Sequence, residues 1–322
     1  MQHRSEKADP RDEARAILAL MMTPGLGKAT IHRMIRIARS AGMSAAGLAG
    51  LKPWSLVEVL HGLPGDAVAG LIKARTHATD QAGDLLRRIE RIGGRAAPFM
   101  AADFPNGLSR SLGLQAPPLL FLRGDPSIAR AACASVVGAR RVSTRGRRIA
   151  KHCAGTFAGI GAPVVSGGAQ GVDMAAHAAA LKEGGMTIVV LPQGLLTYHA
   201  PWTIEKAIGD GRALLVSEFV PDAGWETHAA VQRNATISAL SRLVCVIEPK
   251  KTGGSIRTAR CALRQGKRVL VSWAWRHRQA GRGLVDAGAY PLLDGRARFA
   301  ADRLIEFWNA GPPPRKGQTE LF

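Results

Sequence analysis

Residues 134–148 read ASVVGARRVSTRGRR, and this stretch decides the class of fold. It starts with a short apolar run, which is typical of a β-strand buried on both faces of a sheet. Gly138 follows, and Ser143 and Thr144 then supply hydroxyl groups that favour the start of a helix. A buried strand that passes through a glycine turn into a helix is the building unit of an α/β sheet.

The same pattern repeats along the rest of the chain. Short runs rich in Val, Leu and Ile predict strands at 118–122, 134–137, 163–165, 187–191, 214–217, 243–247 and 269–272. Most of the gaps between these runs hold alanine-rich segments of helix length. Such alternation predicts right-handed crossovers and an α/β fold with an extended, Rossmann-like, doubly wound and mostly parallel sheet.

The hydrophobic spacing divides the chain into three expected regions. Residues 1–94 carry apolar side chains at helical spacing, with Asp9 and Pro10 as a helix-start signal, and predict a small all-helical domain. Residues 95–308 contain the predicted strands and form the expected Rossmann-like domain. Residues 309–322 are rich in proline and are expected to be a tail without regular structure.

The charge of the chain favours a polyanionic partner. Its formal net charge is +20, and arginines outnumber lysines by three to one. Arginine binds phosphate through two parallel hydrogen bonds, whereas lysine acts as a point charge. The hydrophobic content of 46% is ordinary for a folded protein, which excludes disorder of the whole chain. Aromatic residues make up 5%, so platforms for base stacking should be few.

The sequence also indicates in which compartment of the cell the protein is expected. No apolar run approaches the roughly 18 residues that a membrane span needs, and the N-terminal segment lacks the apolar core of a signal peptide. The cysteines are too far apart for a CxxC metal clamp and too few for a disulfide framework; they are Cys133, Cys153, Cys245 and Cys261. We therefore expect a cytoplasmic protein that contacts no membrane and holds no metal.

Ligands of open parallel sheets bind beyond the carboxyl ends of the strands, so the loops at these ends are the candidate sites. The first such loop follows the strand at 134–137, and the segment from Arg140 to Lys151 carries six basic residues and no acid. The unpaired amides of a helix start favour an anion. The expected phosphate-binding residues of this loop are Gly138, Arg140, Arg141, Ser143, Thr144, Arg145 and Gly146.

The second loop follows the strand at 163–165 and is rich in glycine, which can form a backbone nest for phosphate. Its expected phosphate-binding residues are Ser166, Gly167, Gly168 and Gly171. Asp173 is either a cap of the following helix or a ligand-binding group. His177 is interpreted as a structural histidine rather than a general base, because no nucleophile is evident beside it.

The third loop, at 252–260, opens a helix. Its expected phosphate-binding residues are Gly254, Ser255, Arg257 and Thr258. The surrounding segment 249–285 contains ten basic residues and no acid, whereas an ordinary soluble surface mixes both signs of charge. Arg233 and Asn234, which precede an apolar helical face, suit a further contact at a helix start.

Several enzyme signatures are missing from the sequence. It has no GxxxxGK[ST] loop, no HExxH pair and no GxSxG elbow. The glycine loops do not form GxGxxG with an acid about 20 residues later, which argues against a dinucleotide cofactor. No pair of carboxylates is spaced for acid–base catalysis either, so we expect no catalytic residues and no cofactor.

Together, these loops resemble the DNA-processing protein A family, also called DprA or Smf. The segment 138–146 resembles its G-S-R-x-x-T-x-Y-G pattern, and 166–181 resembles its SG-A-GID-AH-AL signature. The segment 233–241 is similar to its RNRII-gLS stretch, with Ala235 in place of the second arginine, and 254–259 resembles its SGSL-TA segment. Order and spacing agree from about residue 103 to 293.

The resemblance implies a protein that binds single-stranded DNA, protects incoming strands in natural transformation and recombination, and loads the RecA recombinase as a homodimer. It also implies a SAM-like N-terminal domain with a helix-hairpin-helix turn, to which 24–29 correspond. The candidate DNA-backbone contacts in that turn are Gly25, Gly27 and Lys28.

A second interpretation is a nucleotide-binding protein or a phosphoribohydrolase-type Rossmann enzyme, similar to the lysine-decarboxylase-like family that cleaves nucleoside monophosphates. The loop at 252–259 occupies a comparable place in the sheet. Arg260, however, stands near the position of that family's carboxylate, and no acid follows before Asp286. We therefore expect a protein without enzyme activity that holds single-stranded DNA through its phosphates.

Overall fold

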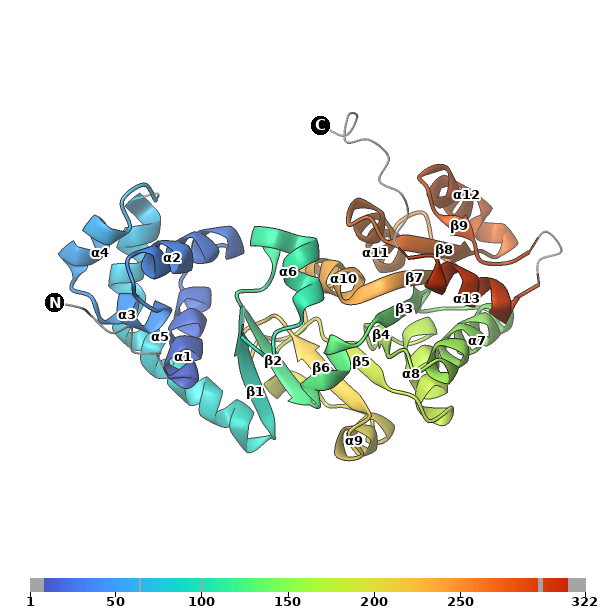
Figure 1. The fold of residues 1–322 in the computed structure, drawn as a ribbon, viewed down its shortest axis with the longest axis horizontal. Helices are drawn as coiled ribbons and strands as arrows, with labels where there is room; N and C mark the ends of the chain where they lie inside the picture. Colours follow the sequence, from blue (N-terminus) through green and yellow to red (C-terminus); the bar gives the residue numbers. More distant parts are fainter. Residues whose placement is uncertain (1–8, 64, 100, 295–297, 312–322) are drawn as a thin grey trace.

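The computed structural model describes residues 9–63, 65–99, 101–294 and 298–311 (Figure 1). A group of helices forms one end of the molecule, and a sheet covered by helices on both faces forms the rest. Residues 312–322 of the expected tail lie outside the described residues. In the described ranges, no helix combines the length and the apolar character needed to cross a bilayer.

The N-terminal region is helical, as the hydrophobic spacing predicts. Its helices are α1 (Pro10–Met22), α2 (Lys28–Ser40), α3 (Ala45–Gly50), α4 (Pro53–Val59) and α5 (Gly65–Arg91). The predicted helix start is confirmed, because the Asp9 carboxylate accepts a hydrogen bond from the Arg11 amide at 2.9 Å. The short helix α3 was not expected from the sequence.

In the described part of the chain, nine strands form one sheet in the order β1-β2-β6-β5-β4-β3-β7-β8-β9. The strands are β1 (Gly94–Pro98), β2 (Leu119–Gly124), β3 (Cys133–Gly138), β4 (Val164–Ser166), β5 (Thr187–Val190), β6 (Ala213–Ser217), β7 (Ser241–Ile247), β8 (Arg268–Ser272) and β9 (Tyr290–Pro291). All neighbours from β6 to β9 are parallel, and β1 and β2 add an antiparallel edge. The predicted α/β class and mostly parallel sheet are confirmed.

Helices cover both faces of this sheet (Figure 1). The helices are α6 (Asn106–Leu112), α7 (Thr144–Gly159), α8 (Val172–Lys182), α9 (Trp202–Gly209), α10 (Thr227–Leu240), α11 (Gly254–Arg264), α12 (Arg278–Asp286) and α13 (Ala301–Asn309). Side chains of α6, α10, α11 and α12 pack on one face, and side chains of α7, α8 and α13 pack on the other. Both faces of the strands are therefore buried, which explains why the strands are apolar without alternation.

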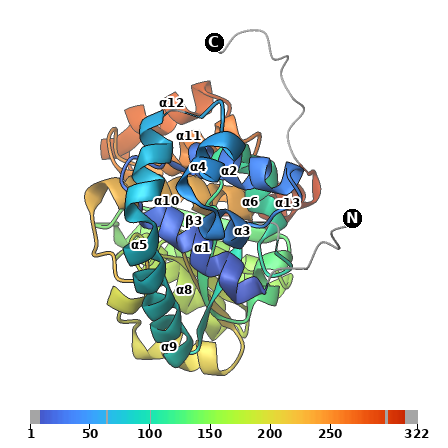
Figure 2. The same cartoon turned by 90° about the vertical axis from the view of Figure 1, so that its left-hand side faces the viewer.

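The N-terminal helices share a hydrophobic core with the sheet. Ile17 of α1 and Leu85 of α5 belong to the same buried cluster as Phe121 of β2 and Val189 of β5. Figure 2 shows these helices gathered in front of the sheet. The division into domains at residues 94 and 308 remains a prediction.

Candidate nucleic-acid interface

The candidate site lies where the order of the strands reverses. From β3, the chain adds β4, β5 and β6 on one side and β7, β8 and β9 on the other. The carboxyl ends of β3 and β7 are adjacent, since Gly138 pairs with Ile247. Diverging loops at such a reversal leave a crevice, which is the usual ligand position in doubly wound sheets.

A cavity of about 340 Å³ occupies this position, and we call it the loop cavity. Its lining comes from the loops after β3, β4 and β7 and from α10 and α11: Val137, Gly138, Ala139, Arg140, Ala169, Asp173, Ala230, Arg233, Asn234, Ile237, Lys250, Thr252, Gly253, Gly254, Ser255 and Thr258. The tertiary structure thus brings together members of all three predicted loops and of the Arg233–Asn234 pair.

Other predicted residues lie around this cavity rather than in its lining. Those in the first two loops are Arg141, Ser143, Thr144, Gly146, Ser166, Gly167, Gly168 and Gly171. Arg257 lines a second cavity. Arg145 lines a third cavity together with Asp294. Whether each residue contacts a phosphate remains a prediction.

Close backbone approach joins the first two loops. Gly171 has a φ of +90°, and a Cβ atom there would lie 2.3 Å from the Arg140 carbonyl oxygen. The next amide, that of Val172, donates to the Ala139 carbonyl at 3.3 Å. Only glycine tolerates both the positive φ and this contact, so the predicted glycine serves the packing of the two loops.

The glycine nest of the second loop is already filled by a carboxyl group of the chain itself. The Asp173 carboxylate accepts hydrogen bonds from the amides of Gly167, at 3.2 Å, and Ala169, at 3.4 Å. Burial raises the pKa of Asp173, and the Arg233 guanidinium and these amides act in the opposite direction. Asp173 therefore organises the loop, and its carboxylate caps the loop amides rather than its own helix.

Arg233 lines the loop cavity as a buried side chain, and it does not lie exposed at the surface. It is 6% exposed, and its Nη1 donates to the Val190 carbonyl at 2.7 Å. Burial lowers the pKa of Arg233, while the carboxylates of Asp173 and Glu218 raise it. Its neighbour Asn234 donates from Nδ2 to the Gly254 carbonyl at 3.4 Å and so connects α10 to the third loop.

The start of α7 is also occupied by a carboxylate of the chain. Ser143 caps the helix by accepting from the Gly146 amide at 3.0 Å. Glu248, directly after β7, accepts from the Ser143 amide at 2.9 Å and from the Ser143 hydroxyl. Glu248 was missed in the sequence, although it is the acid that immediately precedes the acid-free segment at Pro249.

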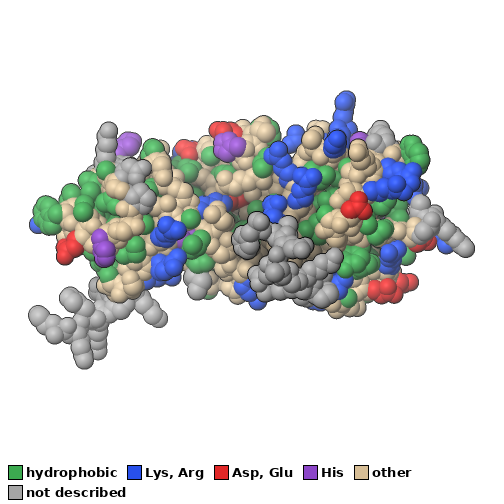
Figure 3. All heavy atoms as spheres, turned by 90° about the horizontal axis from the view of Figure 1, so that it is seen from above, with side chains coloured by type: hydrophobic (Ala, Val, Ile, Leu, Met, Phe, Trp, Pro, Cys, Tyr) green, Lys and Arg blue, Asp and Glu red, His purple; other side chains and the backbone are tan. Residues whose placement is uncertain are grey.

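The exposed charge around the loop cavity is positive. We call the exposed cations of its two flanking loops and of the first turn of α11 the basic rim; they are Arg140, Arg141, Lys250, Lys251 and Arg257. By contrast, Asp173, Glu218 and Glu248 are buried. Figure 3 shows Lys and Arg side chains gathered over the region of α11 and α12. The acids thus hold the loops in place while the cations face solvent.

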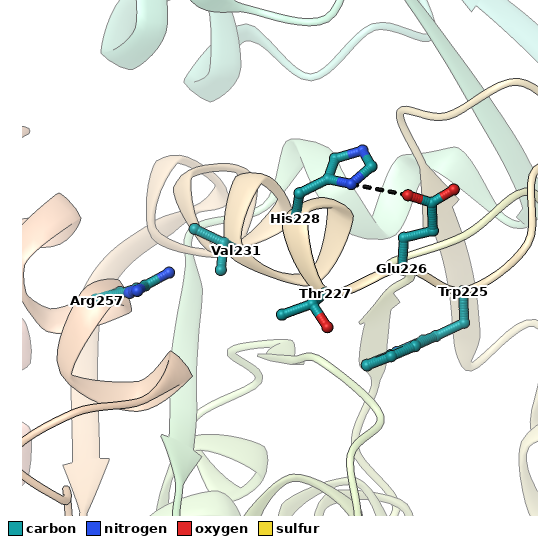
Figure 4. A pocket seen from close by; sticks show the side chains of 6 residues that line it. All are labelled: Trp225, Glu226, Thr227, His228, Val231 and Arg257. Atoms are coloured by element: carbon teal, nitrogen blue, oxygen red, sulfur yellow. Dashed lines mark ion pairs between the residues drawn. The ribbon is translucent and has the colours of Figure 1, made fainter.

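A second, more open cavity of about 720 Å³ is lined by Trp225, Glu226, Thr227, His228, Val231 and Arg257 (Figure 4). We call it the tryptophan cavity. The Arg140 guanidinium lies over the Trp225 ring, 5.9 Å from its centroid. Trp225 was missed because no sequence pattern connects an isolated tryptophan in a loop with an arginine 85 residues earlier.

Lys28 does not point freely to solvent at the predicted hairpin turn. It forms an ion pair with the buried Glu218. Gly25 and Gly27 remain exposed, and Gly25 has a φ of +82° as a tight turn requires. Contacts of these glycines with DNA remain a prediction.

The structure favours the structural interpretation of His177. The side chain is fully buried and lies outside the lining of the loop cavity. Thr187 Oγ1 donates to the Val164 carbonyl, so His177 Nδ1 donates to Thr187 Oγ1 in their 2.7 Å bond. Burial lowers the pKa of His177 to about 3, and the ring is neutral at pH 7.

Comparison with known proteins gives consistent matches. The family of DNA recombination-mediator protein A matches residues 96–299. Protein Smf of Escherichia coli is 38% identical over 157 residues, which cover 48% of this chain and 42% of that protein. The putative DNA processing protein DprA of Mycobacterium tuberculosis is 30% identical over 258 residues, or 74% of this chain and 65% of that protein. The matched segments thus span 42% and 65% of the length of these two relatives.

Two solved structures share the fold. DNA processing protein A from Streptococcus pneumoniae aligns with a TM-score of 0.68 at 22% identity, covering 88% of this chain and 96% of that one. DNA processing protein A from Helicobacter pylori, whose structure is described for its single-stranded DNA binding mode, aligns with a TM-score of 0.56 at 24% identity. That alignment covers 67% of this chain and 96% of that one.

Proposed function

The chain belongs to the DNA recombination-mediator protein A family, and we propose that it binds single-stranded DNA along the basic rim of the loop cavity. The observation that carries this proposal is the meeting of exposed cations from separate loops at one strand reversal, above carboxylates that are buried and bonded inside the chain. A polyanion bound at this rim would contact positive charge, because Asp173, Glu218 and Glu248 are buried beneath it.

The proposed mechanism is capture of backbone phosphates. Arginines such as Arg140 can hold a phosphate through two parallel hydrogen bonds, and Lys250 adds a point charge. Phosphate contacts position a strand but carry no sequence information. We therefore expect affinity that varies little with base sequence and falls steeply as salt rises.

Family membership supports a wider role for the whole protein. We propose that it protects incoming single strands in natural transformation and recombination, loads RecA on them and acts as a homodimer. Sedimentation would measure the dimer, and co-purification with RecA on immobilised single strands would measure the partnership. A monomer that recruits no RecA would restrict the function to strand binding.

We propose binding rather than hydrolysis for the loop cavity. Among the described residues that line this cavity, Asp173 is the acid. It is buried, accepts hydrogen bonds from two amides and interacts electrostatically with Arg233. A carboxylate in that environment is poorly placed to act on a glycosidic bond. Incubation with nucleoside monophosphates and chromatography for released base tests the alternative, and release of base would favour the phosphoribohydrolase interpretation.

The decisive experiment measures binding of the full chain to labelled single-stranded DNA, with double-stranded DNA and RNA as competitors. Arg140→Glu should weaken single-strand binding by about tenfold or more, because a phosphate contact is replaced by repulsion. Arg87→Glu is the matched control, since Arg87 is an exposed arginine on α5 at the helical end of the molecule. Equal affinities of wild type and Arg140→Glu would overturn the proposal.

A further inference from the structure

Trp225 is an exposed aromatic side chain directly beside the proposed phosphate site. It lies in the loop between β6 and α10 and is 50% exposed. The guanidinium of Arg140, which lines the loop cavity, lies over its ring. One arginine side chain therefore connects the phosphate site with an indole ring.

The loop cavity and the tryptophan cavity adjoin along two helices. On α10, Ala230 lines the loop cavity and the next residue, Val231, lines the tryptophan cavity. On α11, Arg257 lines the tryptophan cavity and the next residue, Thr258, lines the loop cavity. A strand whose phosphate occupies the loop cavity would thus place a neighbouring base at the tryptophan cavity.

The tryptophan cavity carries charges of both signs, since the exposed Arg257 of the basic rim and the exposed Glu226 both line it. The tryptophan cavity has an exposed acid, Glu226, whose Oε2 lies 2.8 Å from His228 Nδ1. In Figure 4 this pair lies on one side of α10, and the Trp225 ring extends beneath Thr227. An exposed carboxylate disfavours a phosphate but not an uncharged, planar base.

We propose that Trp225 is a stacking platform for one unpaired base of the bound strand, and this proposal rests on the proposed function. Arg140 fixes the indole by a cation–π contact and leaves half of the residue accessible. Stacking is tolerant of sequence, because every base has a π-face. The platform therefore recognises that a base is present and unpaired, without selecting which base it is.

The test compares two single strands of equal length, oligo-dT and an oligonucleotide of abasic sites, which carry the same phosphates. Both are titrated against wild type, Trp225→Ala, Trp225→Phe and Trp202→Ala. Trp202, on α9, is a matched control because it is 73% exposed and lines neither cavity. The melting temperature of each variant checks that it folds.

Trp225→Ala should lose about fivefold or more in affinity for oligo-dT and keep its affinity for the abasic strand. Trp225→Phe should retain most of the oligo-dT affinity, and Trp202→Ala all of it. An equal loss on both strands would mean that Trp225 only positions Arg140, and no loss on either would mean that it takes no part; both results overturn the platform. If wild type binds neither strand, the proposed function itself fails.

Discussion

Lys28, the first residue of α2, forms an ion pair with Glu218, whose buried side chain follows β6. Glu218 also accepts hydrogen bonds from Gln232 Nε2, at 3.0 Å, and from Thr236 Oγ1, at 2.7 Å. Both of these donors lie on α10, the helix that supplies Arg233 to the loop cavity. A single carboxylate therefore connects the start of α2 to the candidate binding site.

Replacing Lys28 by Met should lower the free energy of unfolding by about 3 kcal/mol, because the buried Glu218 carboxylate loses its ion-pair partner. Urea denaturation measures this change. Lys52→Met removes an exposed lysine from the same helical region and should have little effect. The double variant Lys28→Met with Glu218→Gln should recover part of the loss, and equal stability of Lys28→Met and wild type would contradict the assignment.

Replacing Gly167 by Ala should displace Arg233. A Cβ atom at Gly167 would lie 1.8 Å from Arg233 Nη1, which donates to the Val190 carbonyl. Moving this guanidinium also leaves Asp173 without its cation, so the expected cost is about 2–4 kcal/mol of unfolding free energy. Gly254→Ala is the control, since the nearest atom there is 3.7 Å away. Thermal melts of both variants decide the matter, and an unshifted Gly167→Ala midpoint would be incompatible with this packing.

His177 should make stability depend on pH below neutrality. Its pKa falls from 6.5 to about 3 on folding, so above pH 6.5 it is neutral in both states and contributes no slope. Between about pH 6.5 and 3 the unfolded chain takes up a proton that the folded chain refuses, and the unfolding free energy declines by up to about 1.4 kcal/mol per pH unit.

The pH prediction is checked with His177→Asn, whose amide can still donate to Thr187 but does not titrate in this range. Denaturation between pH 6.5 and 4.5 should show a shallower decline for this variant than for wild type. His61→Asn, at an exposed position, should follow wild type. Parallel curves for His177→Asn and wild type would show that His177 is not buried as described.

Replacing Lys250 by Ala should reduce the salt dependence of single-strand binding. Each phosphate that the protein neutralises contributes about 0.7 to the slope of log K against log salt, so losing one contact should make the slope shallower by about that amount. Lys250 is exposed and lines the loop cavity, whereas Lys182→Ala removes an exposed lysine from the end of α8. An unchanged slope for Lys250→Ala would remove Lys250 from the proposed interface.

Local patterns predicted most elements of the fold. Each strand expected from an apolar run is present, since a strand buried on both faces needs continuous apolar residues. The strand β1 was missed because its residues, GRAAP, include Gly and Pro and no β-branched side chain. The strand β9 was missed because two residues carry no period. Both lie at edges of the sheet, where pairing with one neighbour decides the conformation.

The sequence predicts which loops form the candidate site, but it does not predict which loop amides are already bonded to acids of the chain. Glycines and hydroxyl residues after strands indicated where the backbone turns, and the loop cavity unites members of all these loops. The sequence gives no sign, however, that Asp173 and Glu248 already bind the loop amides of Gly167, Ala169 and Ser143. Which group accepts a hydrogen bond from a given amide depends on distances in the folded chain, and a linear sequence does not contain these distances.

The sequence by itself determined the positive charge, the alternation of buried strands with helices and the glycine turns between them, because composition and periodicity are properties of neighbouring residues. Only the tertiary structure decided which cations stay exposed, which are neutralised, and that Arg140 lies over Trp225. Such pairings depend on where the sheet order places loops that are far apart in the chain. The strength of an electrostatic contact depends on that separation and on burial, and neither can be read from a linear pattern.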